Sequence, residues 1–181
     1  MRQQSIYERI IIETGKEIIK TDGIKAINMR TIASKANISL GSIYNYYKDK
    51  DELLIAVVKS IWTEIAHDNA LNFRDFKSSL SSLYYNIAKG NKTYPDFLKI
   101  HFVSFTNKEE SKMEMNKIIN HIKDSLLRSL ENDKAVKDIF NESFTKIDFV
   151  DFIFENLMTL LLQNKEKDYL LKIIDILLYE N

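Results

Sequence analysis

The residues whose types and spacing could recognise another molecule lie between positions 32 and 50. Ala33 is small, Asn37 follows it by four positions, and Ile43 and Tyr46 follow it by ten and thirteen. This spacing is typical of two short helices that cross closely at a small residue and are joined by a left-handed turn at residue 37. Glycine is usual in such a turn, and asparagine is the other residue type that best tolerates it.

The second of these helices would expose small and hydrogen-bonding groups. Leu40, Gly41, Ser42, Asn45 and, in part, Tyr44 make a narrow surface that could enter a DNA major groove about 12 Å wide. The chemistry that this segment favours is therefore hydrogen bonding to base edges. A helical hairpin with no role in DNA binding has the same spacing and is the alternative.

Lys50 is a second indication of DNA binding. A lysine in the first turn of a helix opposes the helix dipole, so its position is better explained if it faces a phosphate. The alternative is a solvated lysine whose charge is offset by Asp51 and Glu52.

No comparable pattern indicates catalysis or metal binding. The sequence has no cysteine, no GxSxG, no HExxH and no glycine-rich phosphate loop. His67, His101 and His121 do not share the spacing of metal ligands. We therefore expect no enzymatic activity, no metal and no cofactor.

Residues 11–54 resemble the DNA-binding domain of the TetR family of bacterial transcriptional regulators. The positions that carry the resemblance are Ile32-Ala33, Ser39, Ser42, Ile43, Tyr44, Tyr47, Lys50-Asp51 and Leu53-Leu54. Three residues depart from the family pattern: Gly15 replaces alanine, Asn37 replaces the turn glycine, and Tyr47 replaces phenylalanine. Gly15 should cost its helix about 1 kcal/mol, and the Tyr47 hydroxyl should need a route to water.

The resemblance implies DNA contacts for one set of residues: Arg30, Ser39, Leu40, Gly41, Ser42, Tyr44, Asn45, Tyr46 and Lys50. By their chemistry, Arg30 could bind guanine and Asn45 could bind adenine, each through two hydrogen bonds. Ser42, Tyr44 and Lys50 are better suited to phosphate contacts that position the domain without reading bases.

Helical periodicity runs through the whole chain and predicts an all-α fold of about nine helices. The expected helices cover residues 4–21, 29–36, 40–47, 49–65, 75–89, 95–106, 109–131, 146–163 and 167–180, with a short one near 134–140. Gly23 should stop the first helix, Asn28, Ser39 and Asp49 should cap the next three, and Pro95 should open its own helix. We expect a helix-turn-helix DNA-binding domain at 1–48 and an effector-binding and dimerisation domain at 49–181, joined through the fourth helix.

Composition agrees with this class. Four glycines and one proline are too few for a sheet-rich fold. The net charge is zero, with +3 on residues 1–60 and −3 on the rest, which suits a nucleic-acid-binding head, although ordinary scatter is the alternative. No run of eighteen uncharged apolar residues occurs, so we expect a soluble cytoplasmic bacterial protein that does not enter the membrane.

Two C-terminal stretches, Ile147–Leu162 and Tyr169–Tyr179, are apolar around most of their circumference. A helix of this kind needs burial on a second side, which a partner subunit would supply. They resemble the last two helices of the family, which form its dimer interface. The expected interface residues are Phe149, Ile153, Leu157, Leu161, Leu170, Ile174 and Leu177. A buried monomeric core is the alternative.

The middle of the chain carries aromatic side chains and methionines with a few polar groups. The candidates for an apolar or amphipathic effector pocket are Tyr84, Tyr85, Phe97, His101, Phe102, Phe105, Met115 and His121. For any one of them, ordinary core packing is the alternative.

These observations favour a homodimeric repressor that binds a palindromic double-stranded DNA operator and is released by a small-molecule effector of unknown identity. An architectural DNA-binding protein without an effector is the first alternative. A helical enzyme or adaptor with an unused helix-turn-helix is the second.

Overall fold

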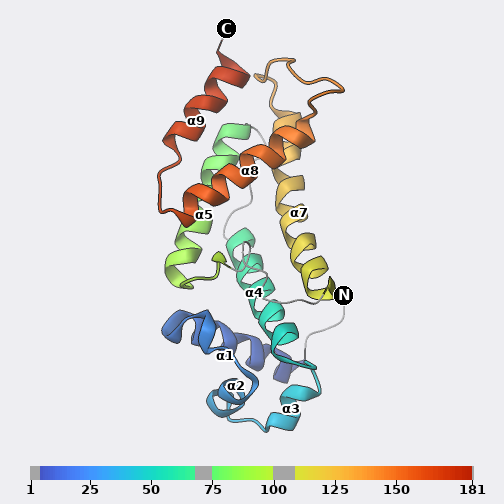
Figure 1. Ribbon diagram of the computed structural model, residues 1–181, viewed down its shortest axis with the longest axis vertical. Helices are drawn as coiled ribbons and strands as arrows, with labels where there is room; N and C mark the ends of the chain where they lie inside the picture. The colour runs from blue at the N-terminus through green and yellow to red at the C-terminus, as the bar shows by residue number, and fades with distance from the viewer. Residues whose placement is uncertain (1–4, 68–74, 100–108, 181) are drawn as a thin grey trace. The chain divides into compact units, whose positions relative to one another are not determined.

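The computed structural model describes residues 5–67, 75–99 and 109–180, and this part of the chain is helical (Figure 1). It contains α1 (Ile6–Asp22), α2 (Met29–Ala36), α3 (Leu40–Tyr44), α4 (Lys50–His67), α5 (Phe76–Thr93), α7 (Glu109–Asn132), α8 (Lys146–Leu162) and α9 (Asp168–Ile174). A 3₁₀ turn, Ile24–Ala26, follows α1, and a π-helical turn, Asp175–Tyr179, continues α9. The expected all-α class is confirmed, and no described helix is long and apolar enough to cross a membrane.

The chain folds into two compact units, residues 1–65 with 90–118 and residues 66–89 with 119–181. The boundary falls within α4, α5 and α7. The expected division after residue 48 is a functional one and stays a prediction.

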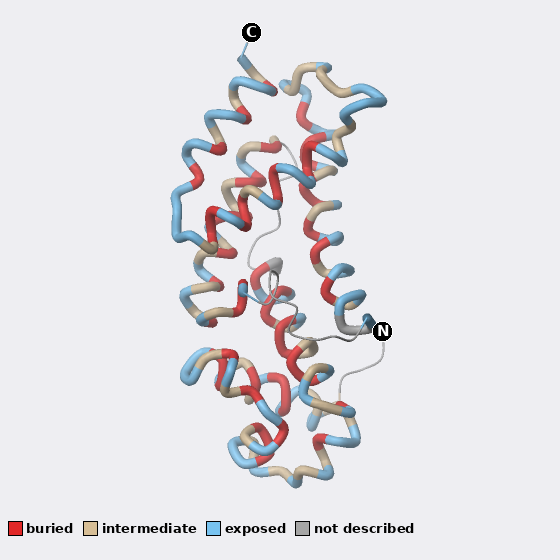
Figure 2. Tube along the Cα trace, viewed as in Figure 1, coloured by how far each residue is buried: buried red, intermediate tan, exposed pale blue. Residues whose placement is uncertain are grey.

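The first unit is built around the inner faces of α1 and α4. Ile11 and Ile18 on α1 and Ile61 on α4 are fully buried, and so are Ile32 on α2 and Ile43 on α3. Figure 2 shows buried segments in red along α1 and α4. Gly23 ends α1 with a φ of 79°, and its N–H donates to the carbonyl of Ile19. The predicted helix stop is therefore confirmed.

Gly15 serves packing between α1 and α4. A Cβ added at residue 15 would lie 2.5 Å from Cγ2 of Val57, which is fully buried on α4. Valine cannot turn away easily because its side chain is branched at Cβ. Glycine at residue 15 lowers the stability of α1 itself, but it allows α1 and α4 to cross closely.

We predict that Gly15→Ala destabilises the protein by about 1 to 3 kcal/mol, because overpacking outweighs the gain in helix propensity. Urea unfolding followed by circular dichroism measures the change. The double variant Gly15→Ala/Val57→Ala removes the clash, so it should be more stable than the sum of the single variants implies. Additive effects would show that the two side chains do not meet.

The end of α5 differs from the sequence prediction. Helix α5 continues to Thr93, and Pro95 lies in a turn after it where we expected the first turn of a new helix. The N–H of Tyr94 donates to the carbonyl of Gly90, and Asp96 has a φ of 66°, which a right-handed helix does not allow. Residues 100–106, the remainder of that expected helix, lie outside the described residues.

Polar contacts join α1, α4 and the end of α5. Lys16 Nζ lies 2.6 Å from a Glu64 carboxylate oxygen, and the Tyr94 hydroxyl donates to both Glu64 oxygens at 3.0 Å. Burial and the bond to Glu64 raise the pKa of Tyr94 to about 12. The phenol therefore stays protonated and keeps donating at physiological pH.

The second unit has a core of large apolar side chains from α5, α8 and α9. Phe76, Phe149, Phe154 and Ile174 are buried, and Phe76 packs on Phe149 with ring centroids 5.8 Å apart. Residues 134–140, where we expected a short helix, form turns and bends, and their first turn is closed by the Val136 N–H bond to the Asp133 carbonyl.

Asp133 ties three parts of the second unit together. Its buried carboxylate accepts from the backbone N–H groups of Phe76 and Ala135, both at 3.0 Å, and from the Tyr179 hydroxyl at 2.7 Å. These donors lie at the start of α5, after α7 and at the end of the π-helical turn.

Candidate DNA-binding surface

Helix α2 begins and ends with the predicted local signals. The Asn28 side chain accepts from the Thr31 N–H at 2.9 Å, which caps the N-terminus. Asn37 takes the left-handed conformation, with φ 52° and ψ 46°. The N–H groups of Asn37 and Ile38 donate to the carbonyls of Ser34 and Ala33, which is the Schellman arrangement at a helix end. The turn expected at Asn37 is confirmed.

Ser39 caps the start of helix α3, and Ile43 anchors the middle of the helix in the core. The Ser39 hydroxyl accepts from the Ser42 N–H at 3.0 Å and lies 2.8 Å from the Ser42 hydroxyl. Ile43 is fully buried. One face of α3 is therefore anchored in the core, and the opposite face turns to solvent.

The start of α4 is held by two carboxylates. Asp49 Oδ1 accepts from the N–H groups of Asp51 and Glu52, at 2.9 and 3.1 Å. A Glu52 oxygen accepts from the Lys48 N–H at 2.7 Å. The expected capping arrangement is confirmed in a variant form, in which Glu52 reaches one residue before the cap.

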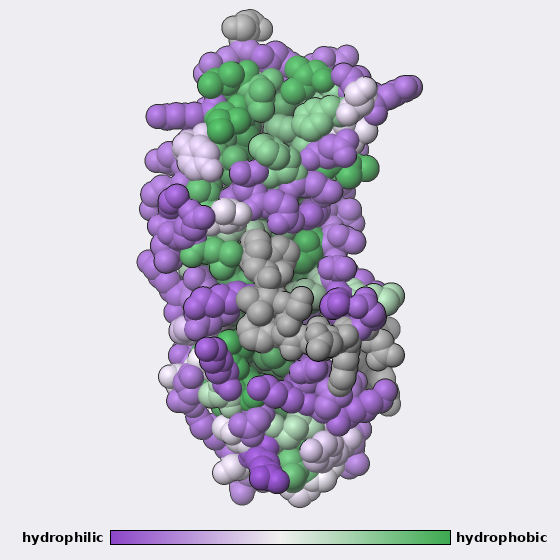
Figure 3. Space-filling view, viewed as in Figure 1, coloured by the Kyte–Doolittle hydropathy of each residue, from purple (hydrophilic) through white to green (hydrophobic). Residues whose placement is uncertain are grey.

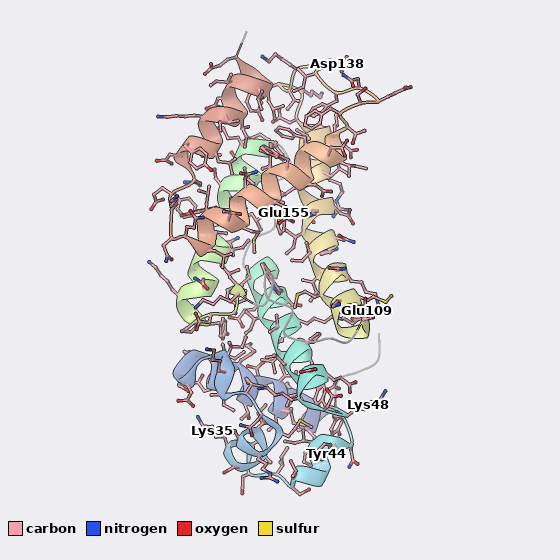
Figure 4. All side chains as sticks on the ribbon, in the orientation of Figure 1. Lys35, Tyr44, Lys48, Glu109, Asp138 and Glu155 are labelled. Carbon is pink, nitrogen blue, oxygen red and sulfur yellow. The ribbon has the colours of Figure 1, made fainter. Side chains whose placement is uncertain are left out.

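The structure places all nine predicted DNA-contact residues at the surface of the first unit. Arg30, Ser39, Gly41, Tyr44, Asn45 and Lys50 are exposed, while Leu40, Ser42 and Tyr46 are half-buried. They come from the start of α2, from Ser39–Tyr46 and from the start of α4. Figure 4 labels Tyr44 on α3 and Lys48 in the loop that follows it.

Lys48 is a cation of this surface that sequence reasoning missed, although the Lys48-x-Lys50 spacing was visible. Within the described part of the chain, no ion pair neutralises Arg30, Lys48 or Lys50. Lys35 on α2 differs, because its Nζ lies 2.6 Å from Asp22. Unpaired cations beside a polar helix face can attract a polyanion without first breaking a salt bridge.

Ser5 is a second missed residue. Its hydroxyl donates to the Tyr46 hydroxyl at 2.9 Å and accepts from the Glu8 N–H at 3.1 Å. Tyr46 thus links the segment that follows α3 to the start of α1. No local signal could reveal a pair separated by 41 positions.

Tyr47 is buried, and its hydroxyl has no hydrogen-bond partner among the described residues. We expected this hydroxyl to have a route to water, and that expectation is wrong. Burial raises the pKa of Tyr47 well above its ordinary value, with the charges of Glu8 and Glu52 adding to the effect. The phenol remains neutral and its polar group is left without compensation.

We predict that Tyr47→Phe stabilises the protein by about 1 to 2 kcal/mol, because it removes an unsatisfied buried hydroxyl while keeping the ring. Urea unfolding tests this. Tyr44→Phe is the matched control, since Tyr44 is 52% exposed, and it should change stability by less than about 0.5 kcal/mol. A loss of stability in Tyr47→Phe would mean that the hydroxyl has a partner.

The predicted pocket residues are distributed over both units. Phe97 and Met115 are buried in the first unit, and Tyr84 is buried in the second. Tyr85 and His121 are exposed, and Tyr85 accepts from Lys167 Nζ at 2.9 Å. His101, Phe102 and Phe105 lie outside the described residues.

The predicted dimer-interface residues are mostly internal to the chain. Leu177 is 41% exposed, whereas Phe149, Ile153, Leu157, Leu161, Leu170 and Ile174 are buried in the second unit. Other apolar residues of the same region are exposed: Phe144, Ile147, Phe152, Tyr169, Ile173 and Ile176. With Leu177 we call these residues the α8/α9 apolar face, and the exposed Asp148, Asp151 and Glu155 lie among them on α8. Figure 3 shows hydrophobic side chains over the start of α8 and the end of α9.

Comparison with known proteins matches the N-terminal part of the chain to a family. Residues 11–57 match the family of bacterial regulatory proteins called tetR. An uncharacterized HTH-type transcriptional regulator in the dhlA 5′ region of Xanthobacter autotrophicus is 26% identical over 127 residues. That alignment covers 56% of this chain and 62% of the relative, so it spans less than two thirds of the relative's length.

Solved structures share the fold. The fatty acid degradation regulator FadR from Bacillus halodurans has a TM-score of 0.67 at 17% sequence identity. The alignment covers 88% of this chain and 84% of the FadR chain. BioQ, solved with its natural double-stranded DNA operator, has a TM-score of 0.63 at 17% sequence identity. The alignment covers 92% of this chain and 95% of the BioQ chain. These similarities extend over both units of the structure.

Proposed function

Because the chain belongs to the TetR family of bacterial transcriptional regulators, we propose that it binds a specific DNA operator as a homodimer and represses transcription. One observation carries this proposal. The capped segment from Asn28 to Lys50 presents Arg30, Tyr44 and Asn45 outward beside two cations that have no ion-pair partner among the described residues. BioQ, which has the same fold, was solved with its operator.

In this proposal the residues of the surface divide into two roles. Arg30 and Asn45 read bases, because guanidinium and amide groups can each form two hydrogen bonds with a purine edge. Ser42, Tyr44 and Lys50 contact phosphates and fix the register of the helix on the duplex. We add Lys48 to the phosphate contacts because it is exposed beside Tyr44.

The α8/α9 apolar face supports dimerisation. Ile147 and Ile176 are both 59% exposed and Phe152 is 53% exposed, an arrangement that water disfavours and a second copy would cover. A two-fold dimer would present two copies of α3, and a palindromic operator would have half-sites about 34 Å apart, one helical turn of DNA.

Selection of DNA from random duplexes by the purified full-length protein tests the proposed function. The enriched sequences should contain an inverted repeat bound by two chains. Enrichment without a shared sequence would favour an architectural DNA-binding protein, and no enrichment would favour a helix-turn-helix that does not bind DNA.

We predict that Lys50→Ala weakens binding to every duplex. It should also make the negative slope of log affinity against log salt shallower by about one for each Lys50–phosphate contact, that is, by about two for the dimer. Fluorescence anisotropy at several salt concentrations measures the slope. Lys92→Ala is the control, because Lys92 is exposed on α5 and is not among the residues of this surface. If the slope were the same in Lys50→Ala and the wild type, Lys50 would not contact phosphate.

We also propose that a small apolar or amphipathic effector releases the protein from DNA. The similar solved structures include one described as a fatty acid degradation regulator, and this chain carries buried aromatic residues in both units. An effector can shift the equilibrium only if its affinity differs between the DNA-binding and the released states. Compounds should therefore be screened by their effect on operator affinity. The protein would act on DNA in the bacterial cytoplasm.

A further inference from the structure

In the second unit, the π-helical turn Asp175–Tyr179 follows α9 directly. The turn is closed by the N–H of Glu180, which donates to the carbonyl of Asp175 at 2.8 Å. This bond spans five residues, one more than the bond of an α-helix. Turns of this kind are rare and are frequent at functional sites. The additional residue therefore needs an explanation.

The turn changes which leucine faces the core. Leu170 and Ile174 are buried on the inner face of α9. An α-helix has about 3.6 residues per turn, so seven residues make almost two full turns. A continuous α-helix would therefore bring Leu177 nearly in line with Leu170. Instead Leu178 is fully buried and Leu177 is 41% exposed. The additional residue shifts the inner face by one position.

The displaced Leu177 extends an outer apolar stripe. Tyr169 and Ile173 are exposed four positions apart, so they are neighbours on the helix surface. Leu177 follows Ile173 by four positions, and Ile176, which is 59% exposed, precedes it directly. A surface helix of a folded domain normally has one apolar stripe, which faces the core. This helix has a second stripe, which is the α9 part of the α8/α9 apolar face.

Ion pairing and hydrogen bonding hold both ends of the turn. At its first residue, both carboxylate oxygens of Asp175 lie 2.6 Å from Lys77 Nζ on α5. At its last residue, the Tyr179 hydroxyl donates to Asp133 at 2.7 Å. All four residues belong to the second unit. The turn is therefore fixed in place by groups that do not belong to the outer stripe.

The core of the second unit does not need the additional residue. If Ile176 were absent, Leu178 would stand seven positions after Leu170, where a continuous α-helix would carry it to the same buried face. Tyr179 would keep its place next to Leu178. On the outside, Leu177 alone would replace the pair that it now forms with Ile176. The additional residue thus enlarges the outer stripe and leaves the inner one complete.

We propose that the π-helical turn sets the register of α9 at the dimer interface, by turning Leu177 outward beside Ile176 so that a second copy of this chain covers both side chains. This inference rests on the proposed function. The occupant is a second copy because the stripe belongs to the face proposed for dimerisation. Lys77 and Asp133 are positioning residues, since they act through the turn.

Deletion of Ile176 tests the proposal, because it should convert the turn into α-helix. Sedimentation equilibrium should show a dimer dissociation constant raised about tenfold or more, since each copy loses an apolar side chain from the interface. The same deletion is also made in the Phe152→Glu variant, which should be monomeric. There it should change Tm by less than about 3 °C, because the core is kept.

Leu177→Ala and Leu178→Ala are a matched pair of neighbouring substitutions. In the Phe152→Glu variant, Leu178→Ala should lower Tm by about 5 °C or more, because it leaves a cavity in the core. Leu177→Ala should change Tm there by less than about 2 °C. With Phe152 intact, Leu177→Ala should raise the dimer dissociation constant about three- to tenfold.

Three results would overturn the inference. The first is a Tm lowered by more than about 3 °C when Ile176 is deleted from the monomeric variant, because the additional residue would then serve the fold. The second is wild-type dimerisation after the deletion. The third is an equal loss of Tm in Leu177→Ala and Leu178→Ala. If wild type were itself monomeric, the proposed homodimer would fail, and the role of the turn with it.

Discussion

Replacing Phe152 with glutamate is expected to make the protein monomeric and to lower its operator affinity by about two to four orders of magnitude. Phe152 is 53% exposed on α8, within the α8/α9 apolar face. A carboxylate there would have to be desolvated without a partner when two copies meet. A monomer binds only one half-site at a time, so it loses the gain that comes from linking two binding modules.

Sedimentation equilibrium and fluorescence anisotropy on the same samples measure both effects. Ile176→Glu should reproduce the result, because Ile176 is 59% exposed on the same face. Met113→Glu is the control: Met113 is 58% exposed on α7, outside the face, so that variant should remain dimeric. If Phe152→Glu stayed dimeric with wild-type affinity, the α8/α9 apolar face would not be the interface.

Replacing Asp133 with alanine is expected to lower the free energy of unfolding by about 3 to 5 kcal/mol, a larger change than we expect for Gly15→Ala or Tyr47→Phe. The substitution leaves the N–H of Phe76 and the hydroxyl of Tyr179 without their acceptor. Losing a charged partner from a buried arrangement costs more than the net value of its hydrogen bonds. Urea unfolding measures the loss, with Asp138→Ala as the control because Asp138 is exposed.

Asp133 also gives stability a pH dependence. Burial alone would raise the pKa of its carboxyl, but the hydrogen bonds from Phe76, Tyr179 and Ala135 outweigh burial and hold the pKa below 3.8, its ordinary value. A lowered pKa in the folded state means that the stabilisation is complete above about pH 4 and is lost as the pH falls through the folded-state pKa. The difference in stability between wild type and Asp133→Asn should therefore shrink below pH 4. A constant difference down to pH 2 would contradict this account.

Much of the helix-turn-helix could be predicted because its signals are local. Asn28, Ser39 and Asp49 each cap a helix through a residue within three positions. Asn37 could be assigned to the left-handed turn because few other residue types tolerate that conformation. The family resemblance then named residues on and around α3, of which Gly41, Tyr44 and Asn45 are exposed; their contact with DNA stays a prediction.

The contacts that could not be predicted join residues far apart in the chain. Gly15 meets Val57 across a helix crossing, and Asp133 accepts from Phe76, which is 57 positions away. In α8 the difficulty was another one. Asp148, Asp151 and Glu155 mark the exposed side of this helix, but the apolar Phe152 lies among them, so its residue type predicted burial together with Ile153.

The most direct test of whether this protein is an operator-binding dimer is its binding to duplex DNA from the region that flanks its own gene. Fluorescence anisotropy at near-physiological salt, titrated with unlabelled random competitor, separates specific from non-specific binding. We expect saturable binding of two chains per site that resists the competitor and depends on Arg30 and Asn45. Binding that the competitor abolishes, or that is unchanged in Arg30→Ala and Asn45→Ala, would contradict it.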